Sequence, residues 1–186
     1  LFSSVQIEAC YPYRGRQPHE TDSEYGLRVA NELEREILAR EPGVVAAFVA
    51  ETVIGATAGA VPPVEGYFKR IREICDRHGV LLILDEVMSG MGRTGTLFAF
   101  EQEGISPDIV TIAKGMGAGY QPIGATLCTQ EIFDTINLHD GFAHGHTYLG
   151  HAIACAAALE VQKVIEDENL LENVRMMGQY LHESLS

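Results

Sequence analysis

Short runs of branched apolar residues recur along the chain, and most of them end at a polar residue. Runs of this length without polar alternation are typical of strands that are buried on both faces of a parallel sheet. We therefore predict strands over residues Val44–Ala50, Leu81–Leu84, Ile109–Ala113 and Ile123–Cys128, with the last as a candidate edge strand.

Between these runs, apolar residues recur every three or four positions, as on one face of a helix. The clearest case follows Thr21, which has the spacing of a capping box with Glu24. Helices are predicted over residues Asp22–Arg40, Val64–His78, Glu131–Ile136, Tyr148–Glu166 and Asn169–Ser186, with a helical turn near Leu97–Gln102. Strands that alternate with helices predict an α/β protein with a largely parallel sheet.

The chain is acidic, with a formal net charge of −13 from 13 basic and 26 acidic side chains. Nucleic acids and anionic membrane surfaces both require a basic face, so neither is expected as a partner. No apolar run approaches the ~18 residues of a membrane-spanning helix. The first residues carry neither an initiator Met nor the basic segment of a signal peptide, so we expect an internal part of a longer chain. The spacing of the four cysteines matches no zinc framework, which favours buried, reduced thiols in a cytoplasmic protein.

Two of the predicted strands end at residues whose side chains can take part in catalysis. Asp85 follows the run Leu81–Leu84, and Lys114 ends the run Ile109–Ala113. Because ligands bind outside the carboxyl ends of parallel strands, we expect this acid and this amine at one rim of the sheet. A lysine that forms a Schiff base and an acid that keeps a pyridine nitrogen protonated together suggest a pyridoxal phosphate site. The same positions are compatible with a structural ion pair or with two unrelated charges.

Three motifs point to a family. They read LLILDEVMSGMGRTGTLFAFE, PDIVTIAKGMGAGYQPIGA and HGHTYLGHAIACAAALEV, in this order along the chain. Together they resemble the class III aminotransferases, pyridoxal-phosphate enzymes of fold type I in the aspartate-aminotransferase superfamily. The resemblance implies a three-layer α/β/α fold with a mostly parallel sheet. Residues 1–166 would form the central part of the large cofactor-binding domain, and residues 167–186 a helix leading toward a C-terminal small domain.

The resemblance also implies roles for individual residues. Lys114 would form the Schiff base with pyridoxal 5′-phosphate and move the proton during catalysis, while Asp85 would bind the pyridine nitrogen. Val87 would pack against one face of the cofactor ring, and Glu51 would order the surroundings of the ring. Thr147 would bind the cofactor phosphate of the neighbouring subunit, which implies a homodimer with shared active sites.

Two positions depart from the family pattern and bear on the substrate. Position 88 is often Gln, which hydrogen-bonds the phenolic oxygen of the cofactor, whereas Met88 would contact the cofactor there but cannot donate. Position 56 is Glu in the ornithine and γ-aminobutyrate enzymes but is Ala56 here. Ala56 weakens an assignment as an ornithine or γ-aminobutyrate enzyme and favours a transaminase that moves an amino group from an amine or ω-amino acid to a keto acid such as pyruvate.

Other interpretations remain open. A racemase or aminomutase of the same family would use the same Lys114 and Asp85 but would return the amino group to the substrate. The chain also lacks the upstream phosphate loop of the family, so this segment alone is expected to be inactive, and it could be a domain piece with no catalytic role.

Four histidines lie close in sequence, at His139, His144, His146 and His151, and they suggest a metal site as an alternative. A zinc site needs three or four convergent ligands. Polar loop histidines near a subunit interface are the preferred interpretation, and no metal is expected.

Overall fold

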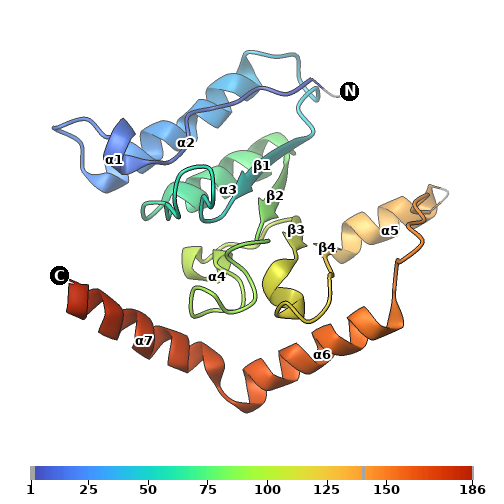
Figure 1. Ribbon diagram of the computed structural model, residues 1–186. Helices are drawn as coiled ribbons and strands as arrows, with labels where there is room; N and C mark the ends of the chain where they lie inside the picture. The colour runs from blue at the N-terminus through green and yellow to red at the C-terminus, as the bar shows by residue number, and fades with distance from the viewer. Residues whose placement is uncertain (1–2, 140, 186) are drawn as a thin grey trace.

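A computed structural model describes residues 3–139 and 141–185 of the chain. These residues form a four-stranded sheet in the order β1-β2-β3-β4 (Figure 1), with the strands Ala47–Glu51, Leu81–Asp85, Ile109–Ile112 and Ala125–Cys128. β1, β2 and β3 run parallel, and β4 pairs antiparallel with β3. The predicted strands are therefore present, and the mixed α/β fold with a mostly parallel sheet is confirmed.

The hydrophobic core lies on one side of this sheet. α3 (Tyr67–His78) packs against β2, and α2 (Asp22–Leu38) packs against α3, so that the two helices and the sheet form neighbouring layers (Figure 1). The largest apolar side chains with less than 2% exposure are Tyr25, Val29, Phe68, Ile71, Ile74, Cys75, Leu82 and Leu84. These residues hold α2 and α3 in place above the strands.

Burial along β2 alternates between the two faces of the sheet. Leu82 and Leu84 are buried, whereas Ile83 and Asp85 are half-buried and Leu81 is exposed. The prediction that the strands are buried on both faces is therefore wrong for the described residues. The physical reason is that α3, with α2 packed against it, covers one face of the strands, so only alternate side chains reach the core.

Local sequence signals place the ends of the N-terminal helices. The hydroxyl of Thr21 accepts a hydrogen bond from the N–H of Glu24 at 3.2 Å, and the carboxylate of Glu24 accepts one from the N–H of Thr21 at 2.8 Å. This arrangement confirms the predicted capping box. α3 begins later than predicted, after Gly66 with φ +88°, and it ends at Gly79 with φ +64°. Both glycines adopt the left-handed conformation that ordinary residues avoid.

Two short helices, α1 (Pro12–Gly15) and α4 (Phe100–Glu103), lie in the connections, and α4 corresponds to the predicted helical turn. The C-terminal part contains α5 (Gln130–Leu138), α6 (Ala152–Asp167) and α7 (Leu170–Leu185), which correspond to the predicted helices. The predicted last residue, Ser186, lies outside the described residues.

α6 and α7 form an arm along the lower side of the molecule in Figure 1. α6 starts at Ala152 instead of Tyr148 because Gly150, with φ +67°, interrupts the turn before it. The helix packs against η1, a 3₁₀ turn over Lys114–Gly117, and it buries Ala154 and Ala158. Among the helices of the described residues, none is both long enough and apolar enough to cross a membrane.

The cysteines differ in their surroundings. Cys10 and Cys75 are buried, whereas Cys128 on β4 and Cys155 on α6 are exposed. The prediction of buried thiols is therefore wrong for Cys128 and Cys155, because no described element covers their side of β4 and α6.

Candidate active site

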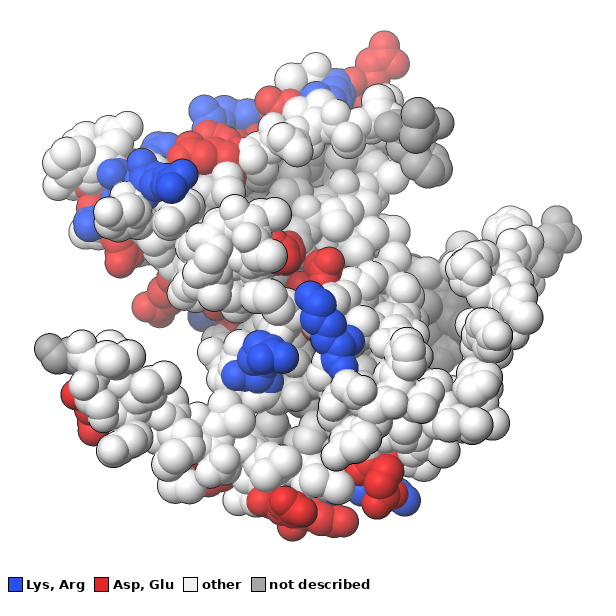
Figure 2. Space-filling view, in the orientation of Figure 1, with Lys and Arg blue, Asp and Glu red and all other residues white. Residues whose placement is uncertain are grey.

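The carboxyl ends of neighbouring strands bring two acids and an amine to one edge of the sheet. Glu51, at the end of β1, is in register with Asp85 at the end of β2. Asp85 is in register with Thr111 of β3, and Lys114 follows the end of that strand. Figure 2 shows acidic and basic side chains gathered in the middle of this face of the molecule. A ligand outside the strand ends would meet all three charged groups.

The carboxylate of Asp85 is fixed on one side and free on the other. Its Oδ1 accepts a hydrogen bond from the backbone N–H of Val87 at 2.8 Å. Within the described residues, Oδ2 has no hydrogen-bond partner, and the side chain is half-buried. The local turn thus orients the carboxylate and leaves one oxygen able to accept a hydrogen bond from a ligand.

Lys114 stands in a strained backbone conformation at the start of η1. Its φ of +44° lies in the left-handed region, which costs a residue with a Cβ roughly 1–2 kcal/mol. The side chain is exposed, and within the described residues its ammonium makes no hydrogen bond or ion pair. A structural ion pair between Asp85 and Lys114 is therefore not formed in this part of the chain. Strain of this kind is often retained where function requires the side chain to point in one direction.

The residue after Lys114 is glycine for a steric reason. A Cβ on Gly115 would lie 3.1 Å from the Cβ of Met91, in the loop that follows β2. This distance is shorter than ordinary van der Waals contact, so a side chain at position 115 would push the loop and η1 apart. The glycine keeps the strand-end lysine close to the loop that carries Val87 and Met88.

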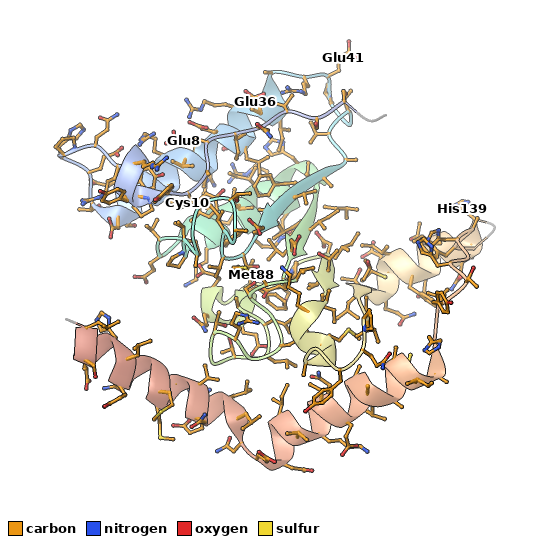
Figure 3. The ribbon with its side chains drawn as sticks, in the orientation of Figure 1. Glu8, Cys10, Glu36, Glu41, Met88 and His139 are labelled. Carbon is orange, nitrogen blue, oxygen red and sulfur yellow. The ribbon has the colours of Figure 1, made fainter. Side chains whose placement is uncertain are left out.

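The side chains of Glu51 and Met88 both lie close to a second glycine, Gly55. Glu51 Oε2 accepts a hydrogen bond from the N–H of Gly55 at 3.2 Å. A Cβ on Gly55 would lie 2.7 Å from both Sδ and Cε of Met88 and 3.2 Å from Glu51 Oε1. Met88 therefore packs beside Glu51 at the carboxyl end of the sheet, near α4 (Figure 3). The thioether adds an apolar surface to the site but no hydrogen-bond donor.

One residue of this region was missed by the sequence interpretation. Glu86, immediately after Asp85, is fully buried, and its carboxylate accepts four hydrogen bonds. A signal for it existed, because Leu82, Leu84 and position 86 fall on the same face of an extended segment. Extending the alternation past the strand would have placed an acid in the core, where acids are rarely found without partners.

Thr147 lies apart from the strand-end residues of the same chain. It is exposed in the turns before α6, a segment that stands away from the ends of β1 and β2 in Figure 1. Within the described residues, no hydrogen bond or ion pair joins Thr147 to Asp85 or Lys114.

The nearby histidines make contacts with one another. The rings of His144 and His146 lie edge to face with their centroids 4.2 Å apart. In residues 3–139 and 141–185, no three His, Cys, Asp or Glu side chains are grouped so that they could hold a metal ion. The zinc alternative thus finds no support in this part of the chain.

The residues at the strand ends fit a pyridine-ring cofactor that binds through an aldehyde. The amine of Lys114 and Oδ2 of Asp85 have no partners in the part of the chain that the structure describes. The amine can therefore bond to a carbonyl carbon, and Oδ2 can accept a hydrogen bond from a protonated ring nitrogen. Val87 and Met88 provide apolar surface nearby. This donor set distinguishes the site from a metal centre, which would need several convergent acceptors.

The comparisons with known proteins all point to aminotransferases. The chain matches the family model for aminotransferase class-III over residues 2–186. It is 50% identical over 177 residues to an aminotransferase from Gibberella zeae, a match that covers 95% of the chain and 35% of that protein. It is 42% identical to gamma aminobutyrate transaminase 3, chloroplastic, from Solanum lycopersicum, over 93% of the chain and 34% of that protein.

A solved structure gives the same result for the fold. The omega transaminase from Pseudomonas jessenii in complex with PMP is 38% identical and matches with a TM-score of 0.90. The match covers 96% of the present chain and 40% of the Pseudomonas jessenii chain. The chain thus spans about a third of the length of the curated relatives it matches.

Proposed function

The chain belongs to the class III aminotransferase family, and on that premise we propose that its full-length protein is a pyridoxal-phosphate-dependent transaminase. The protein would move an amino group from an amine or ω-amino acid to a keto acid such as pyruvate. One observation carries the proposal: the amine of Lys114 and Oδ2 of Asp85, both without partners among the described residues, lie at the ends of neighbouring parallel strands.

The chemistry divides between the cofactor and the chain. When bound, pyridoxal 5′-phosphate supplies an electron sink for the negative charge that forms on the substrate carbon. Nζ of Lys114 would hold the cofactor covalently until the substrate amine displaces it, and the freed amine would then carry the proton that leaves the substrate carbon. Oδ2 of Asp85 would accept a hydrogen bond from the ring nitrogen and favour its charged form.

The other residues shape the surroundings of the ring. Val87 would pack against the ring face, and its N–H orients Asp85. Glu51 orders the β1 end through Gly55, and Met88 would offer no hydrogen-bond donor to the phenolic oxygen of the cofactor. Together these side chains would exclude water from one side of the cofactor.

A homodimer completes the proposed site. Thr147 would bind the cofactor phosphate of the partner subunit, since the connection between α5 and α6 that carries it stands away from the ends of β1 and β2 (Figure 1). The arm formed by α6 and α7 exposes many large apolar side chains, which supports an interface on this side. They include Ile153, Leu159, Val164, Met176, Met177, Tyr180 and Leu181.

We also propose the domain division that the family resemblance implies. Residues 1–166 would belong to the large domain, and residues 167–186 would lead toward a small domain. The boundary falls where α6 ends and Asn169 turns the chain with φ +49°. The first turns of α7 still contact the large domain, because the guanidinium of Arg175 donates to the carbonyl oxygen of Gly95 at 2.5 Å.

Two observations support the proposed substrate class: the residue at position 56 and the name of one relative. Ala56 is exposed in the loop after β1 and offers no carboxylate that could pair with a substrate-binding arginine. A relative named as a γ-aminobutyrate transaminase supports ω-amino acids as donors. The cytoplasmic location expected from the sequence stays a prediction, and the same relative is described as chloroplastic.

Covalent labelling of the full-length protein tests the proposal. Reduction with borohydride after incubation with pyridoxal 5′-phosphate should add the cofactor mass to the peptide that contains Lys114. Lys114→Ala should abolish this labelling, whereas Lys163→Ala, at an exposed lysine of α6 paired with Glu160, should leave it intact. Labelling that persists in Lys114→Ala would contradict the assigned role.

The reaction type needs a second assay. Incubation with amines, β-alanine or γ-aminobutyrate should convert pyruvate to alanine at a rate proportional to enzyme. A protein that carries the cofactor but interconverts its substrate without consuming any keto acid would be a racemase or aminomutase instead.

A further inference from the structure

Glu86 is the most completely coordinated buried acid of the described residues. Its Oε1 accepts hydrogen bonds from the hydroxyl of Thr52 at 2.6 Å and from the N–H of Phe100 at 3.0 Å. Its Oε2 accepts hydrogen bonds from the hydroxyl of Ser89 at 2.7 Å and from the N–H of Ala99 at 3.1 Å. The carboxylate therefore joins three segments that are far apart in the sequence.

The arrangement of these donors requires a carboxylate. Each oxygen takes one hydroxyl and one backbone N–H, and a backbone N–H can only donate. A glutamine at this position would turn its NH₂ group toward either Ala99 or Phe100, whichever way the amide is oriented. One buried N–H would then lose its acceptor, so glutamine is not a neutral replacement despite its equal size.

The backbone of Glu86 is held as firmly as its side chain. Its N–H donates to the carbonyl oxygen of Thr111 at 2.9 Å, and its carbonyl oxygen accepts from the N–H of Gly90 at 2.9 Å. A Cβ on Gly90 would lie 2.8 Å from that carbonyl oxygen, so the loop closes tightly over Glu86. The residue is fixed to β3, to the β1 end and to the start of α4 together.

This anchoring bears directly on the candidate site. The hydrogen bond between Asp85 Oδ1 and the N–H of Val87 spans Glu86. The orientation of Glu86 thus determines whether that bond closes and which way Oδ2 of Asp85 points. Its own side chain points to the core face, opposite to Asp85, so Glu86 acts on the site only through the backbone.

We propose that Glu86 is a positioning residue, which orients Asp85 toward the ring nitrogen of the cofactor by clamping the turn after β2. This inference rests on the proposed function, since it needs a cofactor at Asp85. It adds the requirement for a buried carboxylate behind the end of β2. This carboxylate accepts hydrogen bonds from the hydroxyls of Thr52 and Ser89 and from the N–H groups at the start of α4.

The test uses the full-length protein and compares two glutamate variants. Glu86→Gln breaks the clamp. Glu101→Gln is the matched control, because Glu101 accepts from the N–H of Phe98 at 2.8 Å and holds the same segment without touching the β2 turn. Cofactor-free protein is titrated with pyridoxal 5′-phosphate, and the pH dependence of cofactor absorbance and the thermal midpoint are recorded.

Glu86→Gln should raise the cofactor dissociation constant by about tenfold or more, the equivalent of one unmade buried hydrogen bond. It should also shift the pH profile of the absorbance, which reports the surroundings of the ring. Glu101→Gln should change the dissociation constant by less than about twofold, as expected for an exposed side chain. Wild-type affinity and pH profile in Glu86→Gln, or an equal loss in Glu101→Gln, would overturn the proposal.

Two further variants keep the test decisive if Glu86→Gln does not fold. Ser89→Ala and Thr52→Val each remove one donor and leave the carboxylate in place, so both should weaken cofactor binding in the same direction. Unchanged affinity in both would overturn the proposal. A wild-type protein without cofactor at Lys114 would instead refute the proposed function itself.

Discussion

Asp85 binds its neighbour Val87 through a single carboxylate oxygen, Oδ1, at 2.8 Å. The contact joins the acid expected to bind the ring nitrogen with the residue expected to cover the ring face. Because the bond uses the backbone N–H of Val87, it fixes the acid independently of the side chain at position 87. Oδ2 is the part of Asp85 that remains for chemistry.

Replacement of Asp85 by asparagine should separate these two functions. Asparagine can still accept from Val87 through Oδ1, but its Nδ2 donates where Oδ2 accepted. We expect the amino-transfer rate to fall by about 100-fold or more, in the range found when one preorganised electrostatic group is removed. Asp134→Asn, at an exposed acid of α5, serves as the control. A rate in Asp85→Asn equal to that of the control would remove Asp85 from the mechanism.

The strained backbone at Lys114 predicts an unusual order of stability. With φ at +44°, glycine should fit position 114 better than alanine, so Lys114→Gly should be more stable than Lys114→Ala by about 1 kcal/mol. At the exposed helical position Lys69 in α3 the order should reverse, with glycine less stable than alanine by about 1 kcal/mol. Denaturant unfolding of the cofactor-free proteins measures both pairs, and the same sign at both positions would argue against the strain.

Shared active sites predict complementation between two inactive variants. Lys114→Ala and Thr147→Ala should each lose activity as homodimers. In a mixed dimer, one site combines Lys114 of one subunit with Thr147 of the other and is intact, while the second site carries both changes. Refolding the two variants together should therefore restore activity. If Thr147 served the site of its own subunit, no mixed dimer would contain an intact site, and activity would stay absent.

Glu34 on α2 should make folding sensitive to acid. Its Oε1 pairs with His78 at 3.1 Å and Arg77 at 2.5 Å, and its Oε2 pairs with Arg70 at 2.7 Å. The hydrogen bond from His78, with further contributions from Arg77 and Arg70, lowers the pKa of Glu34 from its ordinary value of 4.5. The folded pKa thus lies below the unfolded one, so the stabilisation is complete above pH 4.5 and is lost as the pH falls through the folded value.

Glu34→Gln should accordingly lower the free energy of unfolding at neutral pH by about 1 kcal/mol. The deficit relative to wild type should shrink in acid. Glu36→Gln, which breaks only the half-buried i,i+4 pair with Arg40, should change stability by less than about 0.5 kcal/mol. A deficit in Glu34→Gln that grows as the pH falls would contradict the pairing.

The buried thiols should resist alkylation. Burial raises the pKa of Cys75 to about 11, and burial also raises the pKa of Cys10. Since only the thiolate reacts, Cys75 should be labelled at pH 8 more than about 100-fold more slowly in the native protein than in denaturant. Mass spectrometry of the iodoacetamide-treated peptides measures this ratio. Native labelling at the rate of an unfolded thiol would show that α3 opens readily.

Local signals in the sequence were sufficient for many of the elements. The capping box of Thr21 and Glu24 predicted the start of α2, and the apolar runs predicted β2 and β3 with Asp85 and Lys114 at their ends. These features depend on residues within a few positions of one another. The cap hydrogen bonds and the spacing of apolar side chains do not depend on distant parts of the chain, so they can be predicted from the sequence.

Contacts between distant residues decided the rest. The sequence by itself determined that an acid and an amine follow neighbouring strands. Only the tertiary structure decided that β4 is antiparallel, that one face of β2 is buried, and that Lys114 forms no ion pair within the described residues. Glu86 shows the reason most clearly, because its partners Thr52 and Phe100 come from other segments, and only folding brings these donors to its carboxylate.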